Sequence, residues 1–305
     1  MMNKKVNFFI VGQPKSGTTS LYKYLNQHPD IFFLNNKEPH IFCKDFHKSS
    51  DKFYRKQKYF EYREKSCIKN LMKGYNNQKI IAEATTNYLF SKTSAKEIYN
   101  YNKDSKILII LRNPFDYLES LHSYYYTKFI DNNSDINISL EDQKFRKQLK
   151  RIPFGVKCPD FLLYSNRVRY YEQIKRYYDL FDENNIKIIL YEEFKSNNSK
   201  YLREVLEFLN LKSSSEIDLS SKANTSKSYK FSIINKISNS KIFLSVIRKI
   251  PMEWKRPIYN ILVKKAQKSK INEENRKKIK KAIKNDMQKL ERFVKKDLMD
   301  FWDLD

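Results

Sequence analysis

A short loop near the N-terminus holds residue types that bind phosphate groups. The apolar stretch FFIVG ends at Gly12, and QPKSGTTS follows before a helical pattern begins. At such a turn from strand to helix, backbone N–H groups and the helix N-terminus form an anion site. The loop residues that we predict to bind phosphate are Lys15, Ser16, Gly17, Thr18, Thr19 and Ser20. A Walker A loop would place a lysine directly after its second glycine, whereas this chain has Thr18 there and its lysine at Lys15.

A second phosphate-binding candidate follows a later apolar run. Arg112 comes directly after KILIIL, at the carboxyl end of a predicted strand, where ligands of open α/β sheets bind. Ser120 lies eight residues further on, about two helical turns, so both side chains could reach one phosphate. An ion pair between Arg112 and Asp116 is the alternative interpretation, and the residues alone favour neither.

Four short β-rich runs alternate with longer helical patterns. The runs are Asn7–Val11, Lys79–Ala82, Lys106–Leu111 and Ile186–Leu190, and the helical patterns include Thr19–Asn26, Tyr117–Phe129 and Arg167–Leu180. Near-continuous apolar runs of this length are typical of strands buried on both faces of a parallel sheet. We therefore predict an α/β fold with a mainly parallel central sheet flanked by helices.

The chain changes character after about residue 212. A Ser/Lys-rich stretch follows, and residues 222–296 carry 23 Lys/Arg against 5 Asp/Glu. The segment 271–302 predicts one or two amphipathic helices whose apolar stripe needs a surface to cover. That stripe consists of Ile279, Ile283, Met287, Leu290 and Val294. We predict one domain over residues 1–305, with an α/β core over 6–212 and a helical extension over 213–305.

The composition describes a folded and strongly basic protein. Hydrophobic residues make up 40% of the 305 residues, and the formal net charge is +25 at pH 7. A solvated lysine-rich surface explains this charge as well as an anionic partner does, whether nucleotide, acidic glycan, nucleic acid or membrane surface. Three widely spaced cysteines indicate neither a disulfide framework nor a zinc site. No apolar run has the length of a membrane span or a signal sequence, so we expect a cytoplasmic protein.

Several motifs, taken together, resemble those of one enzyme family. PKSGTTSL resembles the 5′-phosphosulfate loop of sulfotransferases, and RNP followed by Ser120 resembles their 3′-phosphate motif. KEPHIF, EATTNYL, YEEF, VLEFLNL and DLMDFW extend the resemblance over nearly the whole chain in family order. The branch with heparan sulfate sulfotransferases and their bacterial relatives is the most similar. The resemblance implies a P-loop-like three-layer fold, the cofactor 3′-phosphoadenosine 5′-phosphosulfate (PAPS), the product PAP and no metal.

The resemblance also implies roles on the cofactor side. Lys15 would lie against the oxygen that bridges sulfur and the 5′-phosphate, and would offset charge as the S–O bond breaks. Residues 15–20 would hold the 5′ side. Arg112 and Ser120 would hold the 3′-phosphate that distinguishes PAPS from ATP. The segment KANTSKSYK resembles a late cofactor loop of bacterial members, which places Lys227 or Lys230 on phosphate.

The segment KEPHIF is implied to carry the acid–base chemistry. In the glycan-modifying branch, a glutamate followed two residues later by histidine supplies the general base, and here these residues are Glu38 and His40. A carboxylate within hydrogen-bond reach takes the acceptor's proton during attack. His40 could orient Glu38, act as the base itself, or pack, while Lys37 and Glu83 are expected at the acceptor. Some relatives carry an active-site lysine where this chain has Ala84, so a second catalytic lysine is not expected.

The leading hypothesis is an enzyme that transfers sulfate from PAPS to a hydroxyl or amine of a carbohydrate. The basic tail suits a carbohydrate that already carries carboxylates or sulfates. A P-loop kinase or NTPase is the second hypothesis, although Thr18 occupies the lysine position and no Walker B motif is evident. The third is a basic protein that binds nucleic acid or an anionic membrane, which leaves Lys15, Arg112 and Ser120 unexplained. We expect no nucleic-acid partner. Peripheral membrane contact through the basic C-terminal part stays open.

Overall fold

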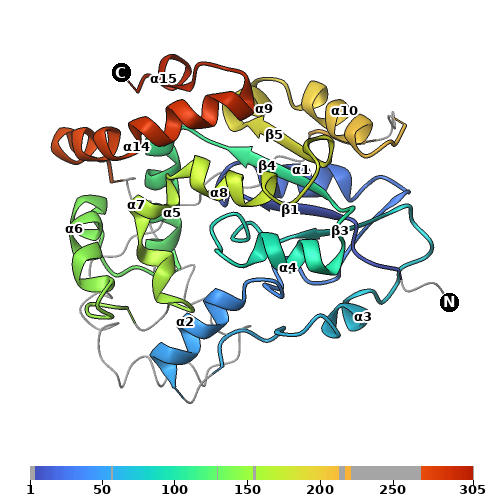
Figure 1. Ribbon diagram of the computed structural model, residues 1–305, viewed down its shortest axis with the longest axis horizontal. Helices are drawn as coiled ribbons and strands as arrows, with labels where there is room; N and C mark the ends of the chain where they lie inside the picture. Colours follow the sequence, from blue (N-terminus) through green and yellow to red (C-terminus); the bar gives the residue numbers. More distant parts are fainter. Residues whose placement is uncertain are drawn as a thin grey trace.

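A parallel five-stranded sheet forms the centre of the molecule in the computed structural model (Figure 1). The structure describes residues 4–55, 58–128, 130–153, 156–212, 217–220 and 269–304. The strand order is β2-β3-β1-β4-β5, and every neighbouring pair is parallel. The strands are β1 (Phe8–Gly12), β2 (Ile31–Phe33), β3 (Ile80–Ala84), β4 (Lys106–Leu111) and β5 (Ile186–Leu190).

The four strands predicted from apolar runs are present, with boundaries that differ by at most two residues. The β2 strand was not predicted, because its three residues, IFF, are too few to show a strand pattern. Tertiary pairing with β3 defines this strand. Ile31 lies opposite Ile80, and Phe33 lies opposite Ala82.

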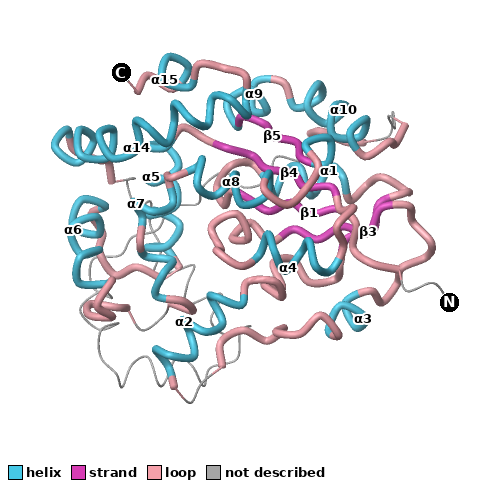
Figure 2. Tube along the Cα trace, in the orientation of Figure 1, coloured by secondary structure: helices cyan, strands magenta, loops and turns pink. Residues whose placement is uncertain are grey.

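Helices cover both faces of the sheet (Figure 2). They are α1 (Thr18–Leu25), α2 (Lys44–Tyr54), α3 (Cys67–Leu71), α4 (Ser94–Tyr101), α5 (Pro114–Thr127), α6 (Ile136–Arg146), α7 (Tyr164–Arg167), α8 (Tyr170–Tyr178), α9 (Tyr191–Ser196), α10 (Asn198–Phe208), α14 (Glu273–Val294) and α15 (Leu298–Phe301), with 3₁₀ turns at Pro159–Leu162 and Glu183–Asn185. Alternate residues of β1 enter two separate apolar clusters. Phe9 and Val11 join the larger cluster, whereas Phe8 and Ile10 join the one beneath α1 and α10. The predicted three-layer α/β class is therefore confirmed.

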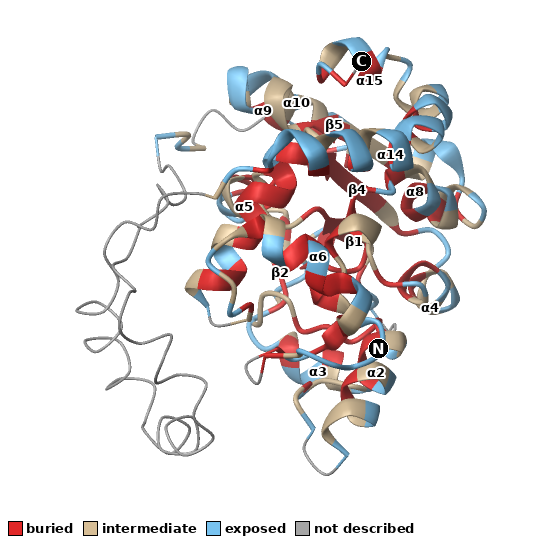
Figure 3. Cartoon of the chain, turned by 90° about the vertical axis from the view of Figure 1, so that its left-hand side faces the viewer, coloured by how far each residue is buried: buried red, intermediate tan, exposed pale blue. Residues whose placement is uncertain are grey.

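The C-terminal helix α14 packs against α8, as Figure 1 shows. Four residues of the predicted apolar stripe, Ile279, Ile283, Met287 and Leu290, are buried, whereas the outward side of the helix is exposed (Figure 3). The Asp286 carboxylate accepts hydrogen bonds from the backbone N–H groups of Tyr171 and Glu172, at the N-terminus of α8. A carboxylate at this position stabilises a helix N-terminus. The segment for which one or two amphipathic helices were predicted forms two helices, α14 and the short α15.

Candidate active site

The predicted site residues follow the carboxyl ends of different strands. Because all five strands are parallel, the loops that follow them lie along one edge of the sheet. The phosphate loop follows β1, and the segment with Glu38 follows β2. Thr86 follows β3, Arg112 follows β4, and Tyr191 follows β5. Residues spread over more than 170 positions of the sequence therefore meet at one edge.

The phosphate loop ends in a helix N-terminus that has no side-chain cap. Gly17 is the N-cap of α1 with φ of 82°, in the left-handed region that favours glycine. A Cβ at this position would lie 3.1 Å from the ring of Phe194, so the loop has room only for glycine. The Ser16 hydroxyl is buried and has no hydrogen-bond partner among the residues that the structure describes. Uncapped N–H groups and an unpartnered buried hydroxyl are donors suited to an anion.

The remaining hydroxyl residues of the loop belong to α1. Thr18 and Thr19 form its first turn together with Ser20, whose backbone N–H donates to the Gly17 carbonyl over 3.0 Å. Thr18 is buried, and Thr19 and Ser20 are half-buried. Lys227 and Lys230, the two lysines implied for a late cofactor loop, lie outside the described residues.

Lys15 connects the phosphate loop to Arg112. The Lys15 carbonyl accepts a hydrogen bond of 2.9 Å from Arg112 Nη1. The Lys15 ammonium lies 4.9 Å from the centroid of the Tyr124 ring on α5, within the range of a cation–π contact. The structure therefore joins the Arg112 guanidinium to the backbone of the phosphate loop, two parts that were predicted from separate motifs.

Arg112 is held on several sides. The Tyr191 ring lies 4.6 Å from its guanidinium carbon, and the Tyr170 hydroxyl donates to its carbonyl over 2.9 Å. The ion pair considered from the sequence exists at 3.6 Å, but the Asp116 side chain is 55% exposed, and exposed pairs contribute little. Within the described ranges, the buried Nε of Arg112 has no hydrogen-bond partner. Ser120 is buried on α5, and in the described residues no hydrogen bond joins it to Arg112.

Lys37 connects the KEPH segment to the phosphate loop. Its Nζ donates a 2.8 Å hydrogen bond to the Thr19 hydroxyl and lies 5.3 Å from the centroid of the Tyr22 ring. Burial lowers the pKa of Lys37, although the nearby Glu38 carboxylate acts in the opposite direction. The lysine therefore sits between the phosphate loop and the predicted base.

Glu38 is fixed by the loop after β3. Its Oε1 accepts a 2.7 Å hydrogen bond from the Thr86 hydroxyl, and its backbone N–H donates to the Ala84 carbonyl over 3.2 Å. Its φ is 60°, which is unfavourable for a residue with a side chain. Thr86 was not predicted as a partner of Glu38. Its position directly after a predicted strand is the only sequence signal that could have suggested this role.

His40 is buried beside Glu38. Its Nδ1 lies 2.5 Å from the Glu38 carbonyl oxygen, and its Nε2 lies 3.5 Å from Asn87 Nδ2. Burial lowers the pKa of His40, while the Glu38 carboxylate acts in the opposite direction. A neutral imidazole is therefore favoured at this position.

Glu83 lies within the fold rather than at an open surface. It belongs to β3 and is 1% exposed. Its carboxylate accepts hydrogen bonds from the Thr85 hydroxyl at 2.5 Å and the Tyr88 hydroxyl at 2.9 Å. Burial raises the pKa of Glu83 to about 8. Contact between Glu83 and an acceptor stays a prediction, and its present neighbours give it a role in joining β3 to the loop with Thr86.

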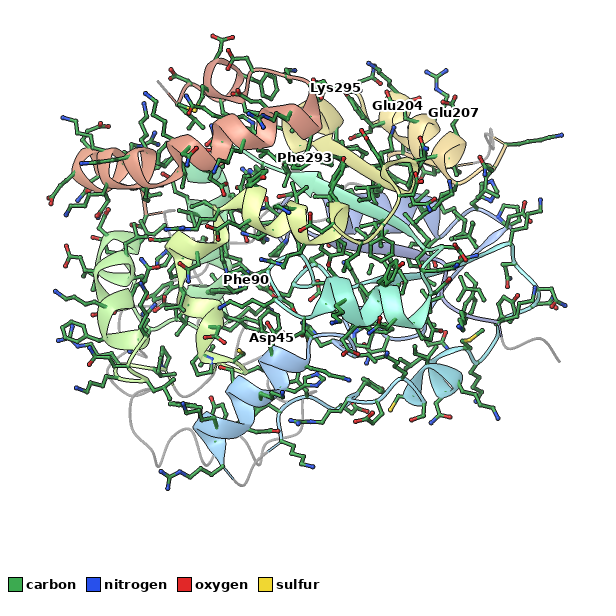
Figure 4. The ribbon with its side chains drawn as sticks, in the orientation of Figure 1. Asp45, Phe90, Glu204, Glu207, Phe293 and Lys295 are labelled. Carbon is green, nitrogen blue, oxygen red and sulfur yellow. The ribbon has the colours of Figure 1, made fainter. Side chains whose placement is uncertain are left out.

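A separate groove of about 790 Å³ lies at the β5 edge of the sheet. Phe293 and Lys295, both labelled in Figure 4 near the end of α14, line it together with Phe208 and Ile188. None of its lining residues belongs to the phosphate loop or the KEPH segment.

Within the described ranges, no group of three or more His, Cys, Asp or Glu residues could hold a metal ion. None of the described helices is long and apolar enough to span a membrane.

A family model supports what the fold and site suggest. The sulfotransferase domain model matches residues 5–293. The chain therefore belongs to the sulfotransferase domain family, as its motifs indicated, and members of this family use PAPS as the sulfuryl donor.

Similar proteins include sulfotransferases of several kinds. The chain is 31% identical over 121 residues to the membrane-associated sulfotransferase kil1 of Dictyostelium discoideum, which covers 40% of this chain and 23% of that protein. It is 26% identical over 117 residues to heparan sulfate glucosamine 3-O-sulfotransferase 3B1 of Mus musculus, covering 37% of this chain and 26% of the mouse protein. The match thus spans about a quarter of these relatives.

A solved structure supports the fold. A sulfotransferase from Alicyclobacillus acidocaldarius superimposes with a TM-score of 0.70 and 24% identity, covering 98% of this chain and 99% of the other. The structural similarity therefore extends over the whole fold.

Proposed function

We propose that this chain transfers the sulfuryl group of PAPS to a hydroxyl or amine of a carbohydrate acceptor. One observation carries the proposal: an uncapped helix N-terminus, two cations and a carboxylate from separate strands meet at one edge of the sheet. The hydrogen bond from Arg112 to the Lys15 carbonyl and the one from Lys37 to Thr19 join these parts. Membership of the sulfotransferase family supports the reaction type.

The residues at this edge fit an anionic nucleotide with phosphates at two positions. Among the described residues, the Ser16 hydroxyl and Arg112 Nε are buried donors without partners, and Gly17 has no Cβ to fill the space at its position. Lys15, Ser16, Gly17, Thr18, Thr19 and Ser20 would hold the 5′ side of PAPS. Arg112 and Ser120 would hold its 3′-phosphate, for which a planar guanidinium is a suitable partner. When bound, PAPS supplies an activated sulfuryl group on a phosphate leaving group.

Different residues of the chain have different roles in the proposed transfer. Glu38 takes the proton of the acceptor hydroxyl or amine as the new bond to sulfur forms. Lys15 offsets the charge that collects on the 5′-phosphate as its bond to sulfur breaks, which is stabilisation by a preorganised cation. Thr86 holds the carboxylate of Glu38 through a 2.7 Å hydrogen bond. Lys37 lies between Glu38 and the loop, where it restrains both.

A carbohydrate acceptor is supported by two observations. The mouse relative is named for sulfation of heparan sulfate glucosamine, and Glu38 sits at the position that the glycan-modifying branch uses for its base. The charge of +25 suits an acceptor that already carries carboxylate or sulfate groups. Acceptor contacts of Lys37 and Glu83 belong to this proposal, as does a cytoplasmic location, which the free thiols of Cys43, Cys67 and Cys158 support.

A thermal-shift measurement tests the proposal against its alternatives. A ligand that binds the native state raises the melting temperature by mass action, so PAP is expected to stabilise the protein at saturating concentration. ATP with magnesium and a polynucleotide serve as parallel ligands. A shift with ATP and magnesium but none with PAP would overturn the proposal in favour of a P-loop kinase or NTPase. A shift with the polynucleotide alone would favour a nucleic-acid-binding protein.

A further inference from the structure

A buried arginine lies behind the predicted base without a carboxylate partner. Arg167 is 1% exposed, and in the described part of the chain no Asp or Glu lies within ion-pair distance of it. Its guanidinium carbon lies 4.3 Å from the centroid of Phe90, which Figure 4 labels above Asp45, and 5.3 Å from that of Phe161. A buried cation without a counter-charge is energetically costly. The other contacts of Arg167 therefore indicate the role of its side chain.

Arg167 fixes the orientation of the Asn87 side chain. Arg167 Nη1 donates a 3.2 Å hydrogen bond to Asn87 Oδ1, and Nε donates to the Phe161 carbonyl over 3.1 Å. A guanidinium only donates hydrogen bonds, so it requires the oxygen of the amide on its side. The Nδ2 group of Asn87 must therefore face the other way, and there it lies 3.5 Å from His40 Nε2.

This orientation decides which nitrogen of His40 carries the proton. Because Asn87 Nδ2 is a donor, His40 Nε2 must be the unprotonated acceptor. Nδ1 then carries the hydrogen, and it donates to the Glu38 carbonyl at 2.5 Å. A proton added at Nε2 would face the Asn87 amide N–H. It would also add positive charge to a region that already contains Arg167.

The other groups around His40 are consistent with a neutral ring. Burial lowers the pKa of His40 most, and Lys157 and His47 lower it further, whereas the Glu38 carboxylate and the hydrogen bond to the Glu38 backbone raise it. His47 Nε2 lies 2.8 Å from the His40 carbonyl oxygen, and Cys43 Sγ donates to the same oxygen over 2.9 Å. The Phe60 ring covers the imidazole at 5.5 Å between centroids. These contacts hold both the ring and the backbone of His40.

We propose that Arg167, Asn87 and His40 form a relay that locks His40 as the neutral Nδ1–H tautomer, so that His40 positions Glu38 and does not itself act as the base. The relay acts on the Glu38 backbone, which has φ of 60°, as His40 has φ of 61°. Two left-handed residues that flank a proline are costly, so hydrogen bonds from outside must hold them. Thr86 fixes the carboxylate of Glu38 and His40 fixes the backbone of Glu38, so that together they orient the predicted base. This inference rests on the proposed role of Glu38.

The tautomer can be measured without any enzymatic assay. The chain has 4 histidines, so ¹⁵N-labelled imidazole signals can be assigned by comparison with His40→Asn. The expected spectrum at pH 7 has a protonated Nδ1 and an unprotonated Nε2 for His40. Asn87→Asp removes the donor and supplies an acceptor, so it is expected to protonate Nε2. An imidazolium at pH 7, or an Asn87→Asp spectrum identical to wild type, would overturn the relay.

Two isosteric variants separate positioning from base catalysis. The amide of His40→Asn can replace the Nδ1 donor, whereas His40→Gln places its amide near Nε2. If His40 positions Glu38, His40→Asn keeps turnover within about tenfold of wild type, while His40→Gln loses about 10²-fold, the size expected for a misplaced catalytic group. The Kd of PAP is expected to be unchanged in both variants. A base cannot be replaced by an amide, so equal inactivity of both folded variants would refute the positioning role.

These measurements also separate the relay from the proposed function. If PAP does not bind but His40 shows the expected tautomer, the relay stands and the sulfotransferase proposal fails. If PAP binds and turnover is measurable but His40 is cationic, the relay fails alone. Ile138→Ala, at an exposed apolar residue of α6, serves as a matched control that should leave the histidine spectrum and turnover unchanged.

Discussion

Glu38 owes its geometry to one side chain of its own segment and one from the loop after β3. Thr86 accounts for the direction of its carboxylate, and His40 accounts for the conformation of its backbone. A group that is held in this way needs no rearrangement when an acceptor arrives, which is the usual requirement for general base catalysis. The charged groups at this edge and the buried carboxyl of Glu83 can therefore be tested by single substitutions.

Glu38→Gln is expected to lower kcat by about 10² to 10⁴, because the amide keeps the hydrogen bond from Thr86 but cannot take a proton. The Kd of PAP should stay the same, since the proposed role of Glu38 is toward the acceptor. Steady-state kinetics and calorimetry with PAP measure the two effects. Glu64→Gln, at an exposed residue, is the control. A fall in PAP affinity with unchanged kcat would place Glu38 in the cofactor site instead.

Lys15→Ala and Arg112→Ala are expected to act on different quantities. Removing Lys15 should lower turnover by about 10² to 10³ while changing the Kd of PAP less, because its charge matters most when the leaving phosphate forms. Removing Arg112 should mainly weaken PAP binding, by about 1.5–3 kcal/mol for a charge-assisted contact. Lys69→Ala and Arg203→Ala, at exposed positions, are matched controls. The reverse pattern would show that the two roles are exchanged.

Glu83 predicts a pH dependence of stability. Its pKa is raised by burial to about 8 in the folded protein, against 4.5 for the ordinary group. The folded state thus binds this proton more tightly than the unfolded chain, so the stabilisation is complete below about pH 4.5 and is lost as the pH rises through 8. The free energy of unfolding should fall by about 2 kcal/mol between pH 6 and pH 8 from this residue alone.

Glu83→Gln should remove that part of the dependence. Denaturant unfolding of both proteins at several pH values measures it. Wild-type and Glu83→Gln curves that run parallel from pH 6 to 8 would mean that Glu83 is already ionised in the folded protein.

At the scale of elements, the C-terminal segment supports the Arg112 loop. Trp302 follows α15, and its Nε1 donates a 3.1 Å hydrogen bond to Glu192 Oε2 on α9. The Trp302 carbonyl accepts from Asn113 Nδ2 at 2.8 Å, and the other Glu192 oxygen accepts from the Asn113 N–H at 3.0 Å. Asn113 caps α5 directly after Arg112. The end of the chain therefore closes a ring of hydrogen bonds around the loop after β4.

Trp302→Phe is expected to weaken PAP binding several-fold and to destabilise the fold by about 1–3 kcal/mol, because a Glu192 oxygen loses a buried partner while the aromatic ring is kept. Thermal unfolding with and without PAP gives both quantities. Phe301→Leu, at the neighbouring half-buried residue, keeps the Trp302 bonds and is the control. Equal PAP affinity in Trp302→Phe and wild type would show that the ring of hydrogen bonds does not support the cofactor site.

At the scale of the whole molecule, charge is the dominant property. The net charge is +25, and the residues of α14 include many exposed Lys and Arg side chains. Such a surface attracts anionic chains over a distance of about the Debye length, about 10 Å at 0.1 M salt. Under the proposed function, this surface would select acceptors by charge and the loops at the sheet edge would select them by geometry.

Binding of a heparan sulfate oligosaccharide should weaken several-fold between about 50 and 200 mM salt, because exposed charges are screened. Calorimetry at the two salt concentrations measures the change. A double-stranded DNA of equal charge should bind more weakly than the oligosaccharide and should not affect PAP binding. DNA that binds as tightly as the oligosaccharide and competes with it would indicate a charge-driven surface without a glycan site.

The sequence by itself determined the local elements and the kind of ligand. Apolar runs predicted four of the five strands, and the PKSGTT loop with its displaced lysine indicated an anion site of the sulfotransferase type. These features are readable because strand periodicity and the geometry of a strand-to-helix turn depend on neighbouring residues. The short β2 strand was missed because three residues carry no periodicity.

Only the tertiary structure decided which side chains hold the predicted base. Thr86 and Glu38 are 48 positions apart, and Arg167 and Asn87 are 80 apart. Their contacts depend on the strand order β2-β3-β1-β4-β5, which places the loops after β2 and β3 side by side. No local pattern encodes that order, because strand order arises from how the whole chain packs its apolar faces. The same packing also buries the carboxyl of Glu83 against the hydroxyls of Thr85 and Tyr88.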